Sequence, residues 1–386
     1  MADMILAWLS ALLRWTHVMA GIAWIGSSFY FIAADLSLRG RPGLPEGVKG
    51  ETWQVHGGGF YHIQKYLVAP AHMPEELTWF KWEAYSTWIF GFLLLAATYY
   101  VHPSLYLVDP SVAALEPWQA VAASLASLAV GWLLYDAVCR SPLGRDTRTL
   151  TIAVAVLVAA AAELYLRLFG GRAAFLHVGA LVGSLMVGNV FFIIIPNQKK
   201  VVADLVAGRQ PDPRLGAQAK QRSTHNNYLT LPVLFLMVSN HYPMTFGIHA
   251  RLVLAGLFLT GFLVRHFFNM KHAGLTPHRW LWPAAALVMI ATIATTLPAP
   301  AARAPVSLAE VQTIMAARCV PCHSAKPTFD GIDQPPKGLV FETPEQTAAH
   351  AAEIVQQVVI GRAMPLGNAT GMTEEERARI AAWGGR

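Results

Sequence analysis

The feature that most restricts the fold of this chain is a series of long apolar segments. A bilayer core about 30 Å thick requires roughly 20 apolar residues in a helix. Candidate segments run over 5–34, 79–101, 117–138, 149–168, 174–195, 226–241, 249–268 and 280–297. Of the 386 residues, 54% are hydrophobic and 13% are charged, whereas about a quarter of a soluble domain is charged. We therefore expect an all-α polytopic helix bundle of about eight helices, within residues 1–298, in a lipid bilayer.

The basic residues predict the orientation of the bundle. Loops that face the cytoplasm carry an excess of Lys and Arg. The loops after the first, third, fifth and seventh segments hold 15 such residues, whereas the even-numbered loops hold only Arg172. We expect a multi-pass protein of the bacterial inner membrane with both termini on the periplasmic side. The net charge of +6 is spread between apolar runs and predicts no nucleic-acid partner.

The segment after the last apolar run has a different character. Residues 299–306 are rich in Ala and Pro, and predict a linker to a domain over 307–386. Cys319, Cys322 and His323 have the Cys-x-x-Cys-His spacing of covalent haem c attachment. Met364, in a loop, is the expected second ligand of the haem iron beside His323. Helix-start patterns at Ser307, Thr343 and Thr373 then predict a small all-α domain resembling a class I cytochrome c, with one haem c.

Polar residues gather at the ends of the apolar segments on the cytoplasmic side. They include His56–Lys65, Asn197–Lys200, His225–Tyr228, Arg265 and His266. Ionisable groups at membrane depth are functional candidates. The run Gly57–Gly59 lacks the spacing of a nucleotide-binding loop and indicates only a close approach of backbone to a ligand or helix.

Several stretches resemble the membrane-integrated urate oxidases (urate hydroxylases) that carry a C-terminal cytochrome c. The resemblance covers nearly the whole chain and rests on Val18–Ser28, His56–Lys65, Trp79–Tyr85, Ile195–Lys200 and Ser223–Tyr228. It implies oxidation of urate with water to 5-hydroxyisourate. It also implies that electrons leave through the cytochrome to a downstream acceptor such as a soluble cytochrome or a terminal oxidase.

The residues of the substrate site follow from the chemistry of urate, a planar anionic purine. Such a ligand needs a cation, amides along its edge and an aromatic face. We expect substrate binding by Lys65, Gln198, Lys199, Asn226, Asn227 and Tyr228. A neutral histidine can accept a proton as electrons depart, and His62 and His225 are the catalytic candidates.

Two questions stay open at this stage. The first is function: an electron-transfer subunit fed by a quinol or a partner dehydrogenase is the alternative, and a transporter with a fused cytochrome is a more distant one. The second is the electron route, because the cytoplasmic-side cluster and the haem lie across a core about 30 Å thick. Either a haem b between His17 and His177 bridges that distance, or the urate site is near the outer face, at His177, His241 or His249.

Overall fold

The computed structural model describes residues 2–70, 72–297 and 306–384. The predicted linker at 299–306 lies outside these residues, except for Val306. Eleven α- and π-helical elements of the described residues precede α10: α1 (Ala2–Ser37), α2 (Trp82–Leu95), η1 (Ala96–Tyr100), α3 (Pro103–Tyr106), α4 (Pro117–Arg140), α5 (Thr147–Leu168), α6 (Gly171–Gly188), η3 (Asn189–Ile194), α7 (Ile195–Val206), α8 (Pro213–Val238) and α9 (Ala250–His272). They are followed by α10 (Leu281–Thr295), and short 3-10 turns η2 (Pro142–Arg145), η4 (Ser239–His241) and η5 (Pro243–Thr245) join the longer helices.

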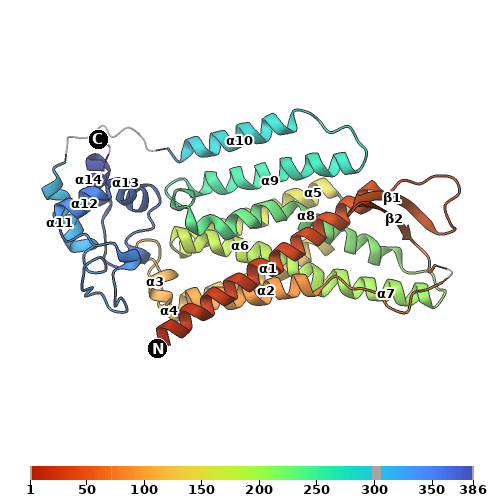
Figure 1. Cartoon of the computed structure of the whole chain (residues 1–386), viewed down its shortest axis with the longest axis horizontal. Helices are drawn as coiled ribbons and strands as arrows, with labels where there is room; N and C mark the ends of the chain where they lie inside the picture. The colour runs from red at the N-terminus through yellow and green to blue at the C-terminus, as the bar shows by residue number, and fades with distance from the viewer. Residues whose placement is uncertain (1, 71, 298–305, 385–386) are drawn as a thin grey trace.

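Most of these helices lie side by side along the long axis of the molecule (Figure 1). Within the described residues, five helices are long and apolar enough to cross a membrane: Met4–Ser37, Pro117–Arg140, Thr147–Leu168, Gly171–Val206 and Ala250–His272. The central one is α6, which packs against α2, α4, α5 and α8 and is the most buried. Side chains such as Ile152 and Leu287 remain exposed on the outside of the bundle, as expected of helices whose outer surface meets lipid.

Two helices extend further than their apolar segments. The helix that contains α6 continues through a π-helical turn, η3, into α7 and ends at Val206. Helix α8 begins at Pro213, where the Asp212 side chain caps it, and keeps Pro232 in its interior. The residues Asn197–Lys200 and His225–Tyr228 therefore lie on helices, not in loops. The expected count of eight membrane crossings stays a prediction.

One element contradicts the all-α prediction. Strands β1 (Val48–His56) and β2 (Gly59–Tyr66) form an antiparallel hairpin with His56 opposite Gly59. Gly57 and Gly58 have φ values of +61° and +79°, which are typical of the two-residue turn that joins twisted strands. A Cβ at any of Gly57–Gly59 would meet nothing within 4 Å. The glycines therefore serve a turn, and no described helix approaches them closely; the predicted approach to a ligand stays a prediction.

The C-terminal segment forms a small helical unit with its own apolar cluster. Its elements are α11 (Leu308–Arg318), η6 (Pro336–Gly338), α12 (Pro344–Ala349), α13 (Ala351–Ile354), η7 (Val355–Ile360), η8 (Leu366–Asn368) and α14 (Glu374–Gly384). The helix starts predicted at Ser307 and Thr343 are confirmed as capping boxes, and Thr373 and Glu376 bond reciprocally at the start of α14. Val311, Met315, Phe341 and Ile380 are among the buried side chains of this cluster.

The two ends of the long axis differ. The start of α1, helix α3 and the C-terminal unit lie at one end, which we call the C-terminal end (Figure 1). The hairpin and the end of α7 lie at the other, which we call the hairpin end.

Candidate functional site

The hairpin residues predicted for urate chemistry form a separate surface group. His62 Nε2 lies 2.6 Å from a carboxylate oxygen of Glu51, and the His62 ring stacks on Trp53 at 4.1 Å. Burial by itself would raise the pKa of Glu51, but hydrogen bonds from His62, Gln64 and Trp53, together with the charge of Arg41, hold that pKa below its usual 4.5. Lys65 forms an ion pair with Asp35 of α1. His62 and Lys65 are therefore already engaged with carboxylates.

The predicted residues of α7 also lie on the surface. Gln198 and Lys199 are exposed, and within the stretch Asn197–Lys200 only Asn197 is buried. The side-chain amide of Asn197 donates to the Leu215 carbonyl at 3.2 Å. Lys65, Gln198 and Lys199 thus do not share a pocket with Asn226 and Asn227, which are 4% and 0% exposed inside the bundle. The predicted substrate site is divided into separate groups.

A first buried network surrounds Asn189, at the start of the π-helical turn. Its amide nitrogen donates to the Tyr135 hydroxyl and to Asn226 Oδ1, each at 2.9 Å. The Tyr135 hydroxyl also lies 2.7 Å from Nδ1 of His225. Arg222 donates to Asp136 at 2.7 Å, so its buried charge is compensated. The network links α4, η3 and α8, and π-turns are frequent at functional positions.

A second buried network joins α1, α8 and α9. The Arg265 guanidinium, 6% exposed, donates to Asn227 and Asn269 at 3.3 and 3.0 Å, and it lies 4.0 Å from the ring centre of Phe29. Its partners are neutral, and no acidic side chain in the described chain forms an ion pair with it. The Nδ2 of Asn227 likewise has no hydrogen-bond partner among those residues. Nearby, the Tyr228 hydroxyl lies 2.9 Å from His266 Nδ1.

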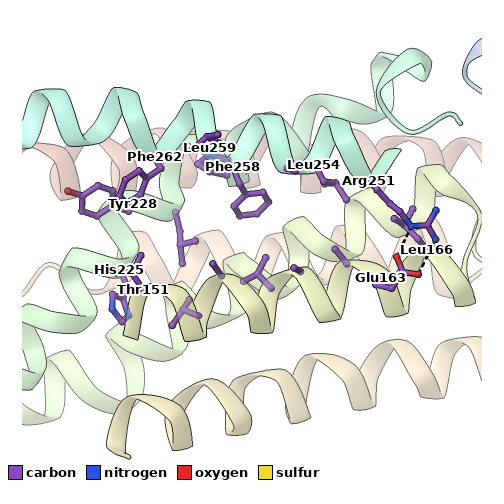
Figure 2. A pocket seen from close by; sticks show the side chains of 18 residues that line it. Thr151, Glu163, Leu166, His225, Tyr228, Arg251, Leu254, Phe258, Leu259 and Phe262 are labelled. Carbon is purple, nitrogen blue, oxygen red and sulfur yellow. Dashed lines mark hydrogen bonds and ion pairs between the residues drawn. The ribbon is translucent and has the colours of Figure 1, made fainter. Parts of the chain in front are cut away.

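A groove of about 620 Å³ runs between α5, α8 and α9 (Figure 2). Aliphatic and aromatic side chains such as Val158, Leu254 and Phe258 form most of its wall. His225 and Tyr228 lie toward one end, and the Glu163–Arg251 ion pair lies toward the other (Figure 2). A wall this apolar suits a hydrocarbon chain better than a urate anion.

A third polar group is centred on His177 of α6, which is fully buried. Its Nδ1 lies 2.7 Å from the Ala173 carbonyl oxygen, and its Nε2 lies 2.7 Å from the Ser124 hydroxyl. Because a carbonyl only accepts, Nδ1 carries the proton and Nε2 accepts from Ser124. The Ser124 oxygen in turn lies 2.7 Å from the Tyr100 hydroxyl. The result is a continuous chain of hydrogen bonds, Tyr100–Ser124–His177, which can pass protons.

Aromatic rings enclose this His177 centre. Phe169 lies 4.7 Å and Tyr165 5.5 Å from the His177 ring, and Tyr99 meets it edge-on at 6.1 Å. Tyr99 is 1% exposed, yet its hydroxyl has no hydrogen-bond partner in the described part of the chain, and the same holds for Nε of Arg172.

The other two histidines predicted for an outer site, His241 and His249, are exposed in the neighbouring loop. Of the three histidines predicted for an outer site, only His177 is inside the bundle.

The His17–His177 pair does not fit a haem b. Both ring nitrogens of His177 are already hydrogen-bonded. His17 binds the Thr87 carbonyl through Nδ1 at 2.8 Å and packs against Gly91 of α2. An iron between two histidines needs one free nitrogen from each, so a second haem stays a prediction for which this pair provides no ligand set.

The residues of the Cys-x-x-Cys-His segment fit a haem c. Cys319 follows the last residue of α11, and the backbone turns so that His323 N donates to the Cys319 carbonyl at 2.8 Å. His323 Nδ1 lies 3.1 Å from the Leu339 carbonyl, which leaves Nε2 for a metal, the usual arrangement of a ligating histidine. Met364 is half-buried against the apolar cluster of this unit. These four side chains would hold the haem and its iron.

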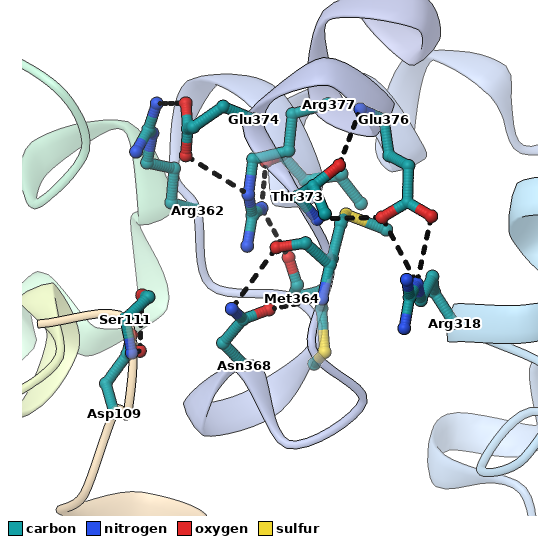
Figure 3. A network of polar contacts seen from close by, with 12 residues as sticks. Asp109, Ser111, Arg318, Arg362, Met364, Asn368, Thr373, Glu374, Glu376 and Arg377 are labelled. Carbon is teal, nitrogen blue, oxygen red and sulfur yellow. Dashed lines mark hydrogen bonds and ion pairs between the residues drawn. The ribbon is translucent and has the colours of Figure 1, made fainter. Parts of the chain in front are cut away.

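Arg377 fixes the loop that carries Met364. This arginine, 7% exposed, donates to the backbone carbonyls of Val358 and Met364, and Asn368 bonds the Met372 backbone in the same loop (Figure 3). Burial lowers the pKa of Arg377, as does the charge of Arg362, while Glu374 and Asp109 act in the opposite direction. The Met364 loop is therefore held by hydrogen bonds on its inner side.

The same loop lies against the apolar bundle. A Cβ at Gly247 would clash with the Ile360 carbonyl oxygen, and one at Gly361 would clash with Pro243 of η5. Gly367 lies close to the backbone of Leu105 and Val108, next to α3, and Ala363 packs against the main core of the bundle. Residues 360–368, which include Met364, thus form the contact with the bundle.

Fold and site together define a bundle of apolar helices, several of them long enough to cross a membrane, with buried polar networks inside. Such a bundle is consistent with membrane association. The chain belongs to the urate oxidase N-terminal family, whose sequence profile matches residues 3–297. This confirms the resemblance to urate oxidases over those residues, whereas the cytochrome assignment rests on the Cys-x-x-Cys-His segment itself. No curated protein and no solved structure matches the chain.

Several residues of these networks were missed by sequence reasoning, namely Tyr99, Ser124, Tyr100, Asp136 and Glu51. Each is brought to its partner by packing between helices or strands, which single-chain spacing does not reveal. Arg172 carried a usable signal, because it is the single basic residue in the even-numbered loops.

Proposed function

We propose that the chain is a membrane-bound urate oxidase that passes electrons to its own haem c. Urate and one water give 5-hydroxyisourate, two protons and two electrons. A haem c held by Cys319, Cys322, His323 and Met364 supplies a one-electron acceptor, so two rounds of reoxidation balance each urate. The oxidant is a downstream one-electron acceptor, such as a soluble cytochrome or a terminal oxidase.

The observation that carries this proposal is the seating of residues 360–368 on the bundle. The match to the urate oxidase family covers the bundle, and the loop of the expected haem ligand Met364 packs directly on it. An electron carrier that was only fused to the bundle would not need the loop of its haem ligand, residues 360–368, to be buried against the bundle. The close packing favours electron transfer from the bundle to the C-terminal unit.

The proposed location is the bacterial inner membrane, with eight crossings and both termini in the periplasm. The start of α1 and the C-terminal unit lie at the same end of the bundle (Figure 1), which an even number of crossings requires. The basic loops lie toward the hairpin end, so the positive-inside rule supports a cytoplasmic hairpin.

Anaerobic mixing of urate with purified, oxidised protein tests the function. We expect the absorption bands of reduced haem c to appear with one equivalent of electrons per haem, and 5-hydroxyisourate to form when an external acceptor is added. A protein with Cys319 and Cys322 both replaced by serine should form no product. Reduction by dithionite without any reduction by urate would overturn the proposal.

The groove supports one second candidate function. Its apolar wall with His225 and Tyr228 at one end suits a ligand that has a long hydrocarbon tail and a polar head, such as a quinol. In that case the chain relays electrons from a quinol or a partner dehydrogenase. Haem reduction by a quinol, with none by urate, would favour this function over urate oxidation.

A further inference from the structure

Two arginines in the apolar bundle lack a compensating carboxylate. Within residues 2–70 and 72–297, Arg172 and Arg265 are inside or at the edge of the bundle without an ion pair, whereas Arg222 pairs with Asp136. A cation removed from water without a partner carries a large desolvation cost. A bound anion would remove that cost, so each arginine marks a place where an anionic ligand fits.

We propose that Arg172, Tyr99 and His177 form the urate-binding site, at the C-terminal end of the bundle. The inference rests on the proposed function and locates its substrate. Sequence reasoning favoured the opposite end for most of the site, with an outer site at His177 as the alternative.

The first support is a set of unused donors. The Tyr99 hydroxyl and Arg172 Nε are buried, and neither forms a hydrogen bond of good geometry in the part of the chain described here, although the Arg172 side chain lies beside that hydroxyl. Arg172 and Arg14 are the cations near the Tyr99 hydroxyl. Helix α6 begins at Gly171, so its first backbone N–H groups add a partial positive charge at the same place. An anion with oxygen atoms on its edge would satisfy these donors.

The second support is the shape and proton chemistry of the surroundings. Tyr106 and His177 lie about 6 Å from the Tyr99 ring, at 6.2 and 6.1 Å, and Phe169 covers His177. Aromatic rings at this position could contact the face or edge of a planar purine. Oxidation of urate releases two protons, and the Tyr100–Ser124–His177 chain provides a neutral imidazole that can take one of them.

The third support is the position of the site relative to the haem ligands. Tyr106 belongs to α3, which contacts η8, directly after Met364 and Pro365. Arg265, in contrast, is 15 residues into α9 from its start at Ala250, which is about 22 Å along the helix axis. Electron transfer weakens steeply with distance, so a substrate at Arg172 reaches the haem without an intermediate redox centre.

The experiment measures urate binding separately from turnover. The full-length protein is reduced with dithionite beforehand, so that its haem accepts no electrons, and urate binding is followed by calorimetry. Arg172→Gln should weaken urate binding at least tenfold while keeping the haem spectrum, and Tyr99→Phe should weaken it several-fold. Arg172→Lys should restore part of the affinity, because it keeps the charge but not the planar fork.

Two matched variants complete the design. Arg167→Gln removes an exposed, paired arginine from α5 and should leave binding within twofold of the unmodified protein. Arg265→Gln tests the alternative that urate binds at Arg265. Loss of binding with Arg265→Gln alone, or unchanged binding in correctly folded Arg172→Gln and Tyr99→Phe, would overturn this site while urate still reduces the haem. A failure of urate to reduce the unmodified protein would instead overturn the proposed function.

Discussion

At the scale of single residues, Ser124 links Tyr100 to the unprotonated nitrogen of His177. Its hydroxyl accepts from Tyr100 and donates to His177 Nε2, and all three groups lie inside the bundle. We expect Ser124→Ala to lower the free energy of unfolding by about 1–3 kcal/mol, because it leaves a buried acceptor unsatisfied. It should also slow urate-driven haem reduction more than it weakens urate binding. Stopped-flow absorption and thermal unfolding measure the two effects.

A control for Ser124 is available on the neighbouring helix. Thr151→Ala also removes a hydroxyl, but that hydroxyl bonds only the Thr147 carbonyl of its own helix. Equal slowing in both variants would mean that Ser124 has no part in proton transfer.

Met364 is the residue whose replacement tests the haem ligation. We expect Met364→Ala to abolish the long-wavelength sulfur-to-iron charge-transfer band, while Cys319 and Cys322 keep the haem attached. Met372→Leu, a volume-conserving change at a methionine that is 4% exposed in the same unit, should keep the band. Persistence of the band in Met364→Ala would identify another sulfur ligand.

The residues differ in how far the sequence could reveal them. The Cys319–His323 pattern is local, and its spacing alone predicts its chemistry. The separation of the predicted substrate residues into groups cannot be recognised in the local sequence, because Lys65 meets Asp35 and His62 meets Glu51 only once the hairpin forms. Tyr99 and Arg172 come from two different helices, and nothing in their spacing predicts that they lie near each other.

At the scale of elements, the hairpin shows a similar limit. Its strands alternate Thr52, Gln54 and His56 with Trp53 and Val55, and its turn contains Gly57-Gly58, so a hairpin signal was present. The apolar segments on either side show a stronger pattern, and no strand was predicted between them. The long helices themselves were predictable, because their apolar length depends on composition and not on packing.

Glu51 gives the hairpin a predicted pH dependence. Its folded-state pKa lies below the usual 4.5 because of His62, Gln64, Trp53 and Arg41, despite an opposing effect of burial. A depressed carboxyl pKa stabilises the folded state above the unfolded-state pKa, and the effect is lost as pH falls through the folded-state pKa. Hydrogen exchange over residues 52–63 should therefore show weaker protection in Glu51→Gln than in the unmodified protein at pH 6, and equal protection well below pH 4. A constant difference at both pH values would contradict this assignment.

At the scale of the whole molecule, the contact between the bundle and residues 360–368 can be broken without touching the haem. Gly247→Val would place a side chain against the Ile360 carbonyl. We expect the haem to remain attached and reducible by ascorbate, while its reduction by urate slows at least tenfold. Gly183→Val, at a position with nothing within 4 Å, is the control. Unchanged reduction by urate in Gly247→Val would show that the packed contact is not the electron route.

The orientation of the molecule is tested by reporters fused after Arg386. We expect alkaline phosphatase, which works only when exported, to be active there, and a cytoplasmic fluorescent reporter to be silent. The reason is the placement of 15 basic residues in the odd-numbered loops against one in the even-numbered loops. Activity of the cytoplasmic reporter would reverse the topology and remove the haem domain from the periplasm.

The burial of the Met364 loop has a consequence for the order of binding events. Because residues 360–368 face the bundle, a soluble partner reaches the C-terminal unit from elsewhere, and the segment 325–338 with Lys326 and Lys337 is exposed. Under the proposed function, electrons would enter and leave the unit through different surfaces. Urate and the soluble partner can then be bound at the same time, so in initial-rate measurements neither should act as a competitive inhibitor of the other at high concentration, as substrates that share one site do.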